Sequence, residues 1–455
     1  MAKVKSKYVC QNCGYESAGY LGKCPECSSW SSFIEEVEQS SDLKSSSVLL
    51  PDAFPPMKLN DIKMGSEIRV KTNISELDRV LGGGIVQGSL ILIAGDPGIG
   101  KSTILLQTSG ELCKQNKKVL YISAEESASQ IKLRAERLGV KSENLYIYPQ
   151  TNFELIKKHV EEMKPDLVIV DSIQAIYSSL IQSTAGSVSQ IRECCNSLMT
   201  IAKTNNVSII VIGHVTKEGN IAGPKVLEHM VDTVIQFEGD KYKTYRILRS
   251  IKNRFGNTSE VGIFEMGSKG LTEVLNPSEL FLKEYNQTQT PGSTIIVTSE
   301  GTRPLLVEVQ ALVGTTPYPT PRRVANGVDL SRVLQILAVL EKRIGLNLSK
   351  QDVYVNVIGG IDVSEPAADL GIALAIITCV RDVIFDSHTA IVGEIGLSGD
   401  IRAVNHIDKR INEAQKLGFK RIIIPSSNEI QDSYNDIEVI KVQRIIEAIT
   451  RSVVK

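Results

Sequence analysis

The sequence has no excess of charge of either sign, few aromatic residues, and no apolar run long enough to cross a bilayer. Its 52 acidic and 51 basic side chains give a net charge of −1. Bulk charge therefore gives no argument for nucleic-acid binding, which would have to rest on local patches. A long apolar run, Leu370–Val380, is shorter than the roughly 20 residues of a membrane-spanning helix. Because the first residues lead into cysteines and not into the apolar core of a signal peptide, we expect a cytoplasmic protein without a membrane partner.

Cysteines are also scarce outside one N-terminal cluster. Four of the eight lie apart from it in apolar helical patterns, which indicates a reduced, cytosolic chain. The cluster consists of two Cys-x2-Cys pairs: Cys10, Cys13, Cys24 and Cys27. Two such pairs can place four thiolates around one Zn²⁺ in a closed, structural site. A redox pair and two disulfides are the alternatives, but neither suits so short a segment. We expect Trp30 and Phe33 to pack on this zinc ribbon.

A glycine-rich stretch fits the pattern G-x-x-x-x-G-K-S/T, which is typical of the phosphate-binding loop of nucleoside triphosphatases. An apolar run over 89–94 precedes it and predicts a buried strand, and a helix is expected from Thr103. Backbone N–H groups of such a loop surround phosphate oxygens at a helix N-terminus. The predicted nucleotide-binding residues are Gly95, Asp96, Pro97, Gly98, Ile99, Gly100, Lys101, Ser102 and Thr103. Lys101 would reach the β- and γ-phosphates, and Ser102 would hold Mg²⁺. A glycine-rich turn with a chance lysine is the alternative.

Apolar strands then alternate with helical patterns, which predicts an α/β domain with a parallel-rich sheet. The expected strands are 118–123, 145–148, 167–171 and 207–213. Ligands collect at the carboxyl ends of such strands. The residues found there are Gly95, Glu125, Asp171 and His214. Asp171 ends a run of four apolar residues, as in a Walker B strand, and is predicted to bind Mg²⁺ through water.

Residues 72–85, which end in Gly82-Gly83-Gly84-Ile85, resemble the entry to the core of RecA-like ATPases. In that fold a carboxylate just past its strand orients the attacking water, which implies Glu125, with Glu126 as the second choice. Either glutamate is also placed to cap the helix expected near Ser127. His214 resembles the polar sensor that couples the γ-phosphate to the next loop. The alternative is that it only forms hydrogen bonds with nearby groups, as a lone histidine more often does.

The segment Lys252-Asn253-Arg254-Phe255-Gly256 follows a strand predicted over 244–249 at the far edge of the domain. Charge there also fits the protection of an edge strand. Together with the glycine triplet, the phosphate loop, the Gly-His-Val-Thr-Lys-Glu-Gly segment 213–219 and the four-cysteine ribbon, this segment resembles the RadA/Sms family of DNA-repair ATPases. The resemblance covers nearly the whole chain.

The resemblance implies a bacterial, DNA-dependent ATPase that forms a ring, expected to be a hexamer. It would translocate on single-stranded DNA, promote branch migration of recombination intermediates, and work with a RecA-type recombinase on branched DNA. Likeness to DnaB-type helicases implies that Lys252 and Arg254 act on the γ-phosphate held by the neighbouring subunit. A cation at that position accelerates phosphoryl transfer by about 10³–10⁵ where it has been measured.

Two mobile-looking loops follow Asp171 and His214, and the family places such loops in the pore of the ring against DNA. Lys217 and Lys225 are the candidate phosphate contacts, with Arg322 and Arg323 as further DNA-binding candidates. Ordinary solvated charge is an equally good interpretation of all four residues.

The length of 455 residues suggests about three domains. We expect the zinc ribbon over 1–34, a linker over 35–58, the RecA-like core over 59–271, a linker over 272–290 and an α+β domain over 291–455. Helices are predicted in this last domain over 331–344 and 367–380.

The last domain resembles the proteolytic domain of Lon, which uses a Ser-Lys dyad. The nucleophile's position falls on Ala367 and the lysine's position on Asp408, with Lys409 one residue late and Ser364 out of place. We therefore expect no peptidase activity.

The alternatives to a DNA motor are a nucleotide-gated scaffold that recruits a recombinase, an ATP-dependent protease, and a strand exchanger of the RecA or circadian-clock type. The ribbon and Lys-Asn-Arg-Phe-Gly argue against the last.

Overall fold

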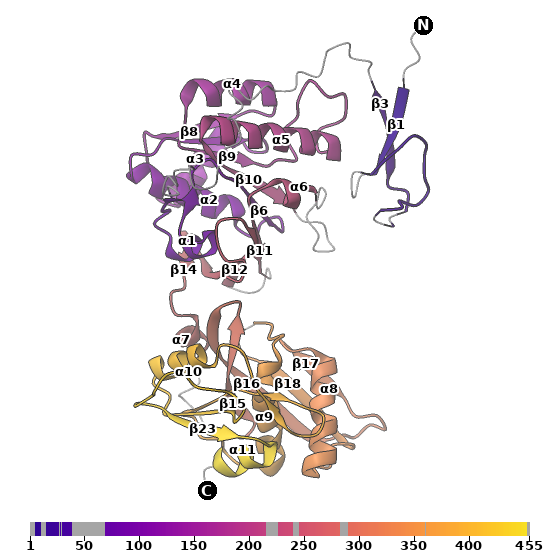
Figure 1. Cartoon of the computed structure of the whole chain (residues 1–455), viewed down its shortest axis with the longest axis vertical. Helices are drawn as coiled ribbons and strands as arrows, with labels where there is room; N and C mark the ends of the chain where they lie inside the picture. Colours follow the sequence, from indigo (N-terminus) through magenta and orange to yellow (C-terminus); the bar gives the residue numbers. More distant parts are fainter. Residues whose placement is uncertain are drawn as a thin grey trace, which may run out of the picture. The chain divides into compact units, whose positions relative to one another are not determined.

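The computed structural model describes residues 5–10, 15–26, 28, 30–38, 69–214, 226–239, 245–282, 290–359 and 361–452. The chain divides into two units, Met1–Val274 and Leu275–Lys455 (Figure 1). Within the described ranges, no helix is both long enough and apolar enough to cross a membrane.

The first unit begins with a small antiparallel sheet in the order β2-β1-β3. Its strands are β1 (Lys5–Cys10), β2 (Glu16–Ser17) and β3 (Phe33–Glu38). Phe33 pairs with Cys10 across the sheet and packs on Cys10 and Cys24, as expected. The packing expected for Trp30 is wrong: its side chain is 73% exposed and lies beneath the ammonium of Lys23. Trp30 precedes β3 and pairs with Lys23 across an isolated bridge.

A nine-stranded sheet forms the body of the first unit, in the order β14-β13-β12-β11-β6-β10-β9-β7-β8. The strands from β11 to β8 in this order are parallel, and β12, β13 and β14 are antiparallel. The bounds are β6 (Leu90–Gly95), β7 (Val119–Ser123), β8 (Leu145–Pro149), β9 (Leu167–Asp171), β10 (Ser208–His214), β11 (Thr233–Glu238), β12 (Tyr245–Asn253), β13 (Val261–Gly267) and β14 (Gly270–Glu273). A short pair, β4 (Arg69–Val70) and β5 (Ile85–Val86), precedes them. The predicted parallel-rich α/β fold is confirmed.

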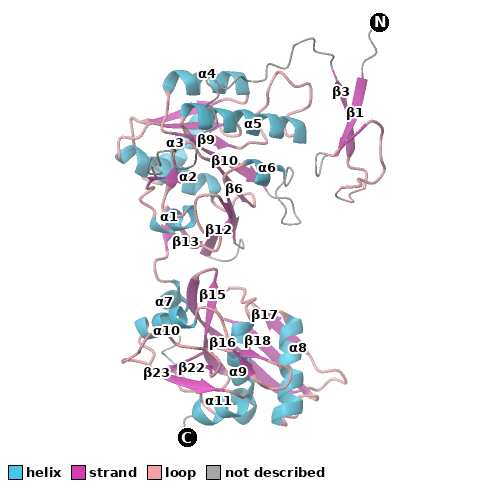
Figure 2. Cartoon of the chain, in the orientation of Figure 1, coloured by secondary structure: helices cyan, strands magenta, loops and turns pink. Residues whose placement is uncertain are grey.

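Helices cover both faces of this sheet (Figure 2), which is why its central strands are continuous apolar runs. Side chains alternate along β6: Ile91 and Ile93 face one core, while Leu90 and Leu92 face the other. The first core is completed by α1 (Ser75–Leu81), α2 (Lys101–Lys114) and α3 (Ala128–Arg137). The second is completed by α4 (Phe153–Met163), α5 (Val188–Asn205) and α6 (Val226–Met230).

The prediction that the strand before Lys252 lies at the edge of the domain is wrong. This strand, β12, has β11 on one side and β13 on the other, and the edge belongs to β14. Sequence reasoning missed the two antiparallel strands over 261–273, so β12 seemed to be the last. Edge protection therefore does not account for the charges of the Lys252–Gly256 segment.

The predicted linker over 272–290 is partly structured. It contains the end of β14 and the helix α7 (Pro277–Phe281). Ser278 is fully buried, and its hydroxyl donates to Glu413 Oε1 at 3.1 Å. Phe281 is also buried, so the apolar content of this short helix attaches it to the second unit.

The second unit is a mixed seven-stranded sheet in the order β17-β18-β16-β15-β19-β22-β23, with helices packed on it. The strands are β15 (Ser293–Glu300), β16 (Arg303–Thr315), β17 (Arg323–Asn326), β18 (Gln351–Val357), β19 (Thr389–Ile391), β22 (Arg421–Pro425) and β23 (Glu438–Val442), with a separate pair β20 (Glu394–Ile395) and β21 (Ile401–Arg402). The helices are α8 (Leu330–Val339), α9 (Asp369–Arg381), α10 (Ile407–Lys416) and α11 (Ile445–Ser452). The helix predicted over 331–344 continues past α8 as a π-helical turn, Leu340–Ile344.

Candidate nucleotide site

The glycine-rich loop connects β6 to α2, at the carboxyl end of the central strand. Lys101 is buried, and its ammonium donates to the carbonyls of Gly95 at 2.7 Å and Asp96 at 2.8 Å. Gly100 has φ +122°, and a Cβ there would lie 2.8 Å from Met266 Cε, so the loop needs glycine at this position. Burial lowers the pKa of Lys101, and the carboxylates of Asp171, Asp96 and Glu125 partly oppose this shift.

Asp171 ends β9 at the same edge of the sheet and is held by a residue that sequence reasoning missed. The hydroxyl of Tyr121, on the adjacent strand β7, donates to Asp171 Oδ2 at 2.6 Å. Burial raises the pKa of Tyr121 well above its ordinary value, and the charge of Asp171 raises it further. Tyr121 therefore keeps its proton and remains a donor. The only signal in the sequence was a tyrosine within an otherwise aliphatic strand.

Glu125 lies between two hydrogen-bonding groups from neighbouring strands. The hydroxyl of Ser172, the residue after Asp171, donates to Glu125 Oε1, and His214 Nε2 lies 3.3 Å from the same oxygen. Burial raises the pKa of Glu125, but the hydrogen bonds from Ser172 and His214 and the charge of Lys101 outweigh burial. The pKa therefore lies below its ordinary value, and the carboxylate is ionised at neutral pH.

The two glutamates after β7 have different surroundings. Glu126 forms an ion pair with Arg134 at 2.6 Å. The cap of α3 is Ser127, which exchanges hydrogen bonds with Gln130, so the capping interpretation of Glu125 and Glu126 is wrong. A serine followed three residues later by glutamine satisfies the helix terminus without either carboxylate.

These residues fit a nucleoside triphosphate with Mg²⁺. Gly98 has φ +78° and open space where a Cβ would lie, which leaves room over the loop. Ser102 and Asp171 supply the hydroxyl and carboxylate oxygens that Mg²⁺ prefers. His214 Nδ1 is buried and has no hydrogen-bond partner in the described part of the chain.

The Lys252–Gly256 segment lies at the opposite end of the same sheet, where the parallel strands begin; we call this end the amino edge and the end that carries the loop the carboxyl edge. Arg254 N donates to the carbonyl of Asp232 at 3.1 Å, and Asp232 immediately precedes β11. Because β11 runs parallel to β6, Asp232 lies beside Leu90, at the start of β6, whereas the phosphate loop follows its end. The strand is 6 residues long and separates these ends by roughly 17 Å at about 3.3 Å per residue. The Arg254 side chain therefore lies beyond reach of the loop of its own chain.

Two glycine-containing motifs that are far apart in the sequence meet near this edge. Asn253 Nδ2 donates to the carbonyl of Leu81 at 3.2 Å, and the Arg69 guanidinium donates to the carbonyls of Gly82 and Phe255. A Cβ on Gly82 would lie 3.2 Å from Gly256 Cα. Gly82 also ends α1 with φ +80°, so the close approach and the left-handed turn both favour glycine there.

One cysteine from each Cys-x2-Cys pair is described, and the two converge. Cys10 and Cys24 are both fully buried and lie in one cluster with Phe33. The proximity of Cys10 and Cys24 fits a metal ion shared by the two pairs. Cys13 and Cys27 lie outside the described residues.

The candidate DNA-binding residues are only partly described. Lys217 and Lys225 lie outside the described residues. Arg322 is exposed, and its guanidinium stacks 4.2 Å from the ring centroid of Tyr318. Arg323 donates to the carbonyls of Leu348 and Gln351, so this guanidinium is engaged within its own unit.

The Lon-like positions are occupied by structural contacts. Ala367 is buried, and the Asp408 carboxylate accepts a hydrogen bond from the Tyr434 hydroxyl at 2.9 Å. Nearby, the fully buried guanidinium of Arg410 forms an ion pair with Glu365 and donates to a backbone carbonyl of β15. The absence of peptidase activity stays a prediction.

The phosphate loop after β6, the acidic end of β9 and the helices on both faces of a mostly parallel sheet define a RecA-like P-loop nucleoside triphosphatase. Three family models agree with the domain order. Residues 8–35 match a rubredoxin metal-binding domain, residues 54–220 an AAA domain, and residues 329–428 subunit ChlI of Mg-chelatase.

Curated relatives identify the family. A protein of Halalkalibacterium halodurans is 53% identical over 94% of both chains, and proteins of Listeria monocytogenes and Bacillus subtilis are each 51% identical over 99% of both chains. All three are named DNA repair protein RadA. The chain belongs to the RadA family, as the resemblance in its sequence predicted. Among solved structures, a KaiC-like protein of Pyrococcus horikoshii is 21% identical with a TM-score of 0.39, covering 46% of this chain and 99% of that protein.

Proposed function

We propose that this protein is a DNA-dependent ATPase and motor that acts on single-stranded and branched DNA during recombination and repair, where it promotes branch migration. The observation that supports this most directly is the division of charged groups between the two edges of one sheet. Lys101, Glu125 and Asp171 lie at the carboxyl edge, and Arg254 lies at the amino edge.

At the carboxyl edge, each side chain has a definite task. Lys101 and the loop amides bind the phosphates, and Ser102 and Asp171 hold the Mg²⁺ that neutralises them. The ionised Glu125 carboxylate, fixed by Ser172 and His214, orients water toward the γ-phosphate and accepts its proton. His214 thereby connects the hydrolytic carboxylate to the chain that follows β10.

At the amino edge, the Lys252–Arg254 segment has no access to the nucleotide of its own subunit. A second copy of the chain, packed with its loop against this edge, would bring the segment to a phosphate. Repetition of that contact generates a closed ring, and the family resemblance suggests a hexamer with DNA in its pore. The metal ribbon and the segment that contains Lys217 and Lys225 are further candidate contacts for DNA or a RecA-type recombinase.

The proposal is tested with the purified full chain, by measuring ATP hydrolysis with and without single-stranded DNA. We expect DNA to stimulate turnover and K101A to reduce it to background. K114A is the matched control, because Lys114 lies on the same helix but is 70% exposed. Turnover that does not depend on Lys101 or on DNA would contradict the proposal. Unwinding of a forked duplex separates the motor from a nucleotide-gated scaffold.

A further inference from the structure

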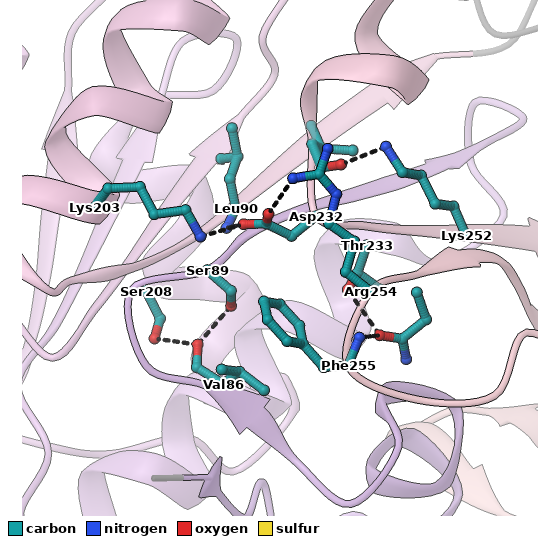
Figure 3. Close-up of polar contacts among 12 residues, drawn as sticks. Val86, Ser89, Leu90, Lys203, Ser208, Asp232, Thr233, Lys252, Arg254 and Phe255 are labelled. Atoms are coloured by element: carbon teal, nitrogen blue, oxygen red, sulfur yellow. Dashed lines mark hydrogen bonds and ion pairs between the residues drawn. The ribbon is translucent and has the colours of Figure 1, made fainter. Parts of the chain in front are cut away.

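A buried carboxylate lies between two partly exposed cations at the amino edge of the sheet (Figure 3). Asp232 has a side chain that is 2% exposed, whereas Lys203 is 49% and Arg254 is 55% exposed. Burial of a carboxylate is costly unless it is paired and hydrogen-bonded. The contacts of Asp232 are therefore expected to influence where the Arg254 guanidinium lies.

The two oxygens of Asp232 have different partners. Oδ2 accepts hydrogen bonds from the Leu90 amide at 3.0 Å and from the Lys203 ammonium at 2.8 Å. Among the described residues, Oδ1 accepts from Arg254 alone, at 3.4 Å. Charge-assisted N–H···O bonds are strongest near 2.7–2.9 Å, so the contact to Arg254 is the weak one. Two short bonds fix the carboxylate, and a long bond holds the arginine.

Lys252 is engaged differently from Arg254. Its ammonium donates to the carbonyls of Glu228 at 2.7 Å, His229 at 3.2 Å and Val231 at 2.8 Å, all at the end of α6. An ammonium has three donors, so these contacts use its full capacity. A guanidinium has five donors, and within the described part of the chain Arg254 directs one of them to Asp232. Arg254 is therefore the cation with donors available to a phosphate, while Lys252 stabilises the end of α6.

We infer that Asp232 is the positioning residue for Arg254 at the nucleotide site shared with a second copy of the chain. This inference rests on the proposed function, and it assigns the approach to the phosphate to Arg254 and not to Lys252. Asp232 holds the guanidinium at the amino edge in the orientation from which it reaches the neighbouring γ-phosphate. Because Leu90 and Lys203 hold Oδ2, Arg254 can exchange Oδ1 for a phosphate oxygen without unpairing the carboxylate.

The variant D232N tests this relationship because it preserves the shape of the side chain. The amide oxygen can still accept from Leu90 and Lys203, which turns the amide nitrogen toward Arg254. Two donors then face each other, and the arginine loses its anchor. The control is S208A, since Ser208 is a buried residue at the same edge whose hydroxyl donates to Val86 at 3.2 Å (Figure 3).

The measurement is steady-state ATP hydrolysis by the full chain with single-stranded DNA. We expect D232N to lower kcat by about 10- to 100-fold, the scale of a misplaced catalytic group. The KM for ATP should change by less than about threefold, because the contact of Arg254 with the γ-phosphate stabilises the transition state and not the bound substrate. S208A should keep the kcat of the wild type, and D232N/R254A should be no slower than R254A.

Mixing of subunits provides a readout that a general structural defect does not produce. K101A lacks a working loop but carries an intact Asp232 and Arg254, and D232N has the opposite defect. We expect a mixture of the two variants to be more active than either protein alone, because an intact loop meets an intact arginine at some interfaces. K203M, at a half-exposed site, is a second variant if D232N is unstable. K203M should lower kcat by about 3- to 10-fold when Arg254 is present. It should have no further effect on kcat in the R254A background.

The outcomes separate the inference from the proposed function. If R254A loses activity while D232N keeps the kcat of the wild type, Asp232 has no positioning role and the shared site stands. If the losses of D232N and R254A multiply, or mixing restores nothing, the effect of D232N is structural and the inference is wrong. If R254A hydrolyses ATP at the rate of the wild type, both the shared site and the inference are wrong.

Discussion

The hydroxyl of Tyr121 donates to the carboxylate of Asp171 at 2.6 Å, from the strand next to the one that Asp171 ends. This contact leaves the other carboxylate oxygen of Asp171 for Mg²⁺ or its water. It also joins two parallel strands at the edge where the nucleotide is proposed to bind. Tyr121 would therefore orient Asp171 in the proposed magnesium site, although its ring belongs to the core.

We expect Y121F to leave the Asp171 carboxylate less well oriented and so to weaken the binding of Mg²⁺. Loss of the donor leaves a partly buried carboxylate oxygen unpaired, which should lower the free energy of unfolding by about 1–3 kcal/mol. The Mg²⁺ concentration needed for half-maximal ATP hydrolysis should rise. Y146F is the control because Tyr146, on β8, is 39% exposed. An unchanged magnesium titration would separate Tyr121 from the metal site.

The Glu125 carboxylate should set the acid limb of the activity profile. The pKa of Glu125 lies below its ordinary value, so the carboxylate is ionised at neutral pH. It becomes protonated only as pH falls through this lowered pKa of the folded protein. S172A removes a hydrogen bond that lowers this pKa and should move the acid limb of kcat upward in pH. A profile that stays in place in S172A would contradict this assignment.

E125Q should lower kcat by about 10²-fold or more, the scale of a lost general base, while ATP binding remains. E126Q is the matched control, because Glu126 forms a partly exposed ion pair with Arg134 and its substitution should change kcat little. ATP binding and hydrolysis are measured separately by a fluorescent analogue and by phosphate release. If E126Q lost more activity than E125Q, the roles of the two glutamates would be reversed.

The ion pair between the buried Arg410 and the partly exposed Glu365 should be required for the stability of the second unit. Arg410 is 1% exposed, so E365Q leaves an uncompensated buried cation and should cost about 3–5 kcal/mol in urea unfolding. R402Q breaks an exposed pair with Asp400 and should cost less than about 1 kcal/mol. Equal losses in the two variants would show that burial does not govern this pair.

Metal content should depend on the N-terminal cysteines and not on the other thiols. C10S and C24S should each lose zinc, as measured by atomic absorption of the purified chain. C379S should retain it, because Cys379 lies in the second unit. Full zinc content in C24S would mean that the two Cys-x2-Cys pairs do not share a metal.

The sequence by itself determined the elements whose signals are local. These elements include the strand, loop and helix around Lys101 and the apolar run that ends in Asp171. They and the family could be predicted because each signal depends on residues that are neighbours in the chain. Tertiary structure decided the rest, since strand order and register bring together residues far apart in sequence. These decisions include Tyr121 beside Asp171, the internal position of β12, and Asp232 with Arg254 at the edge opposite the loop. No local pattern encodes which end of a sheet an arginine occupies, because that depends on how the antiparallel strand that carries it pairs with the parallel strand beside it.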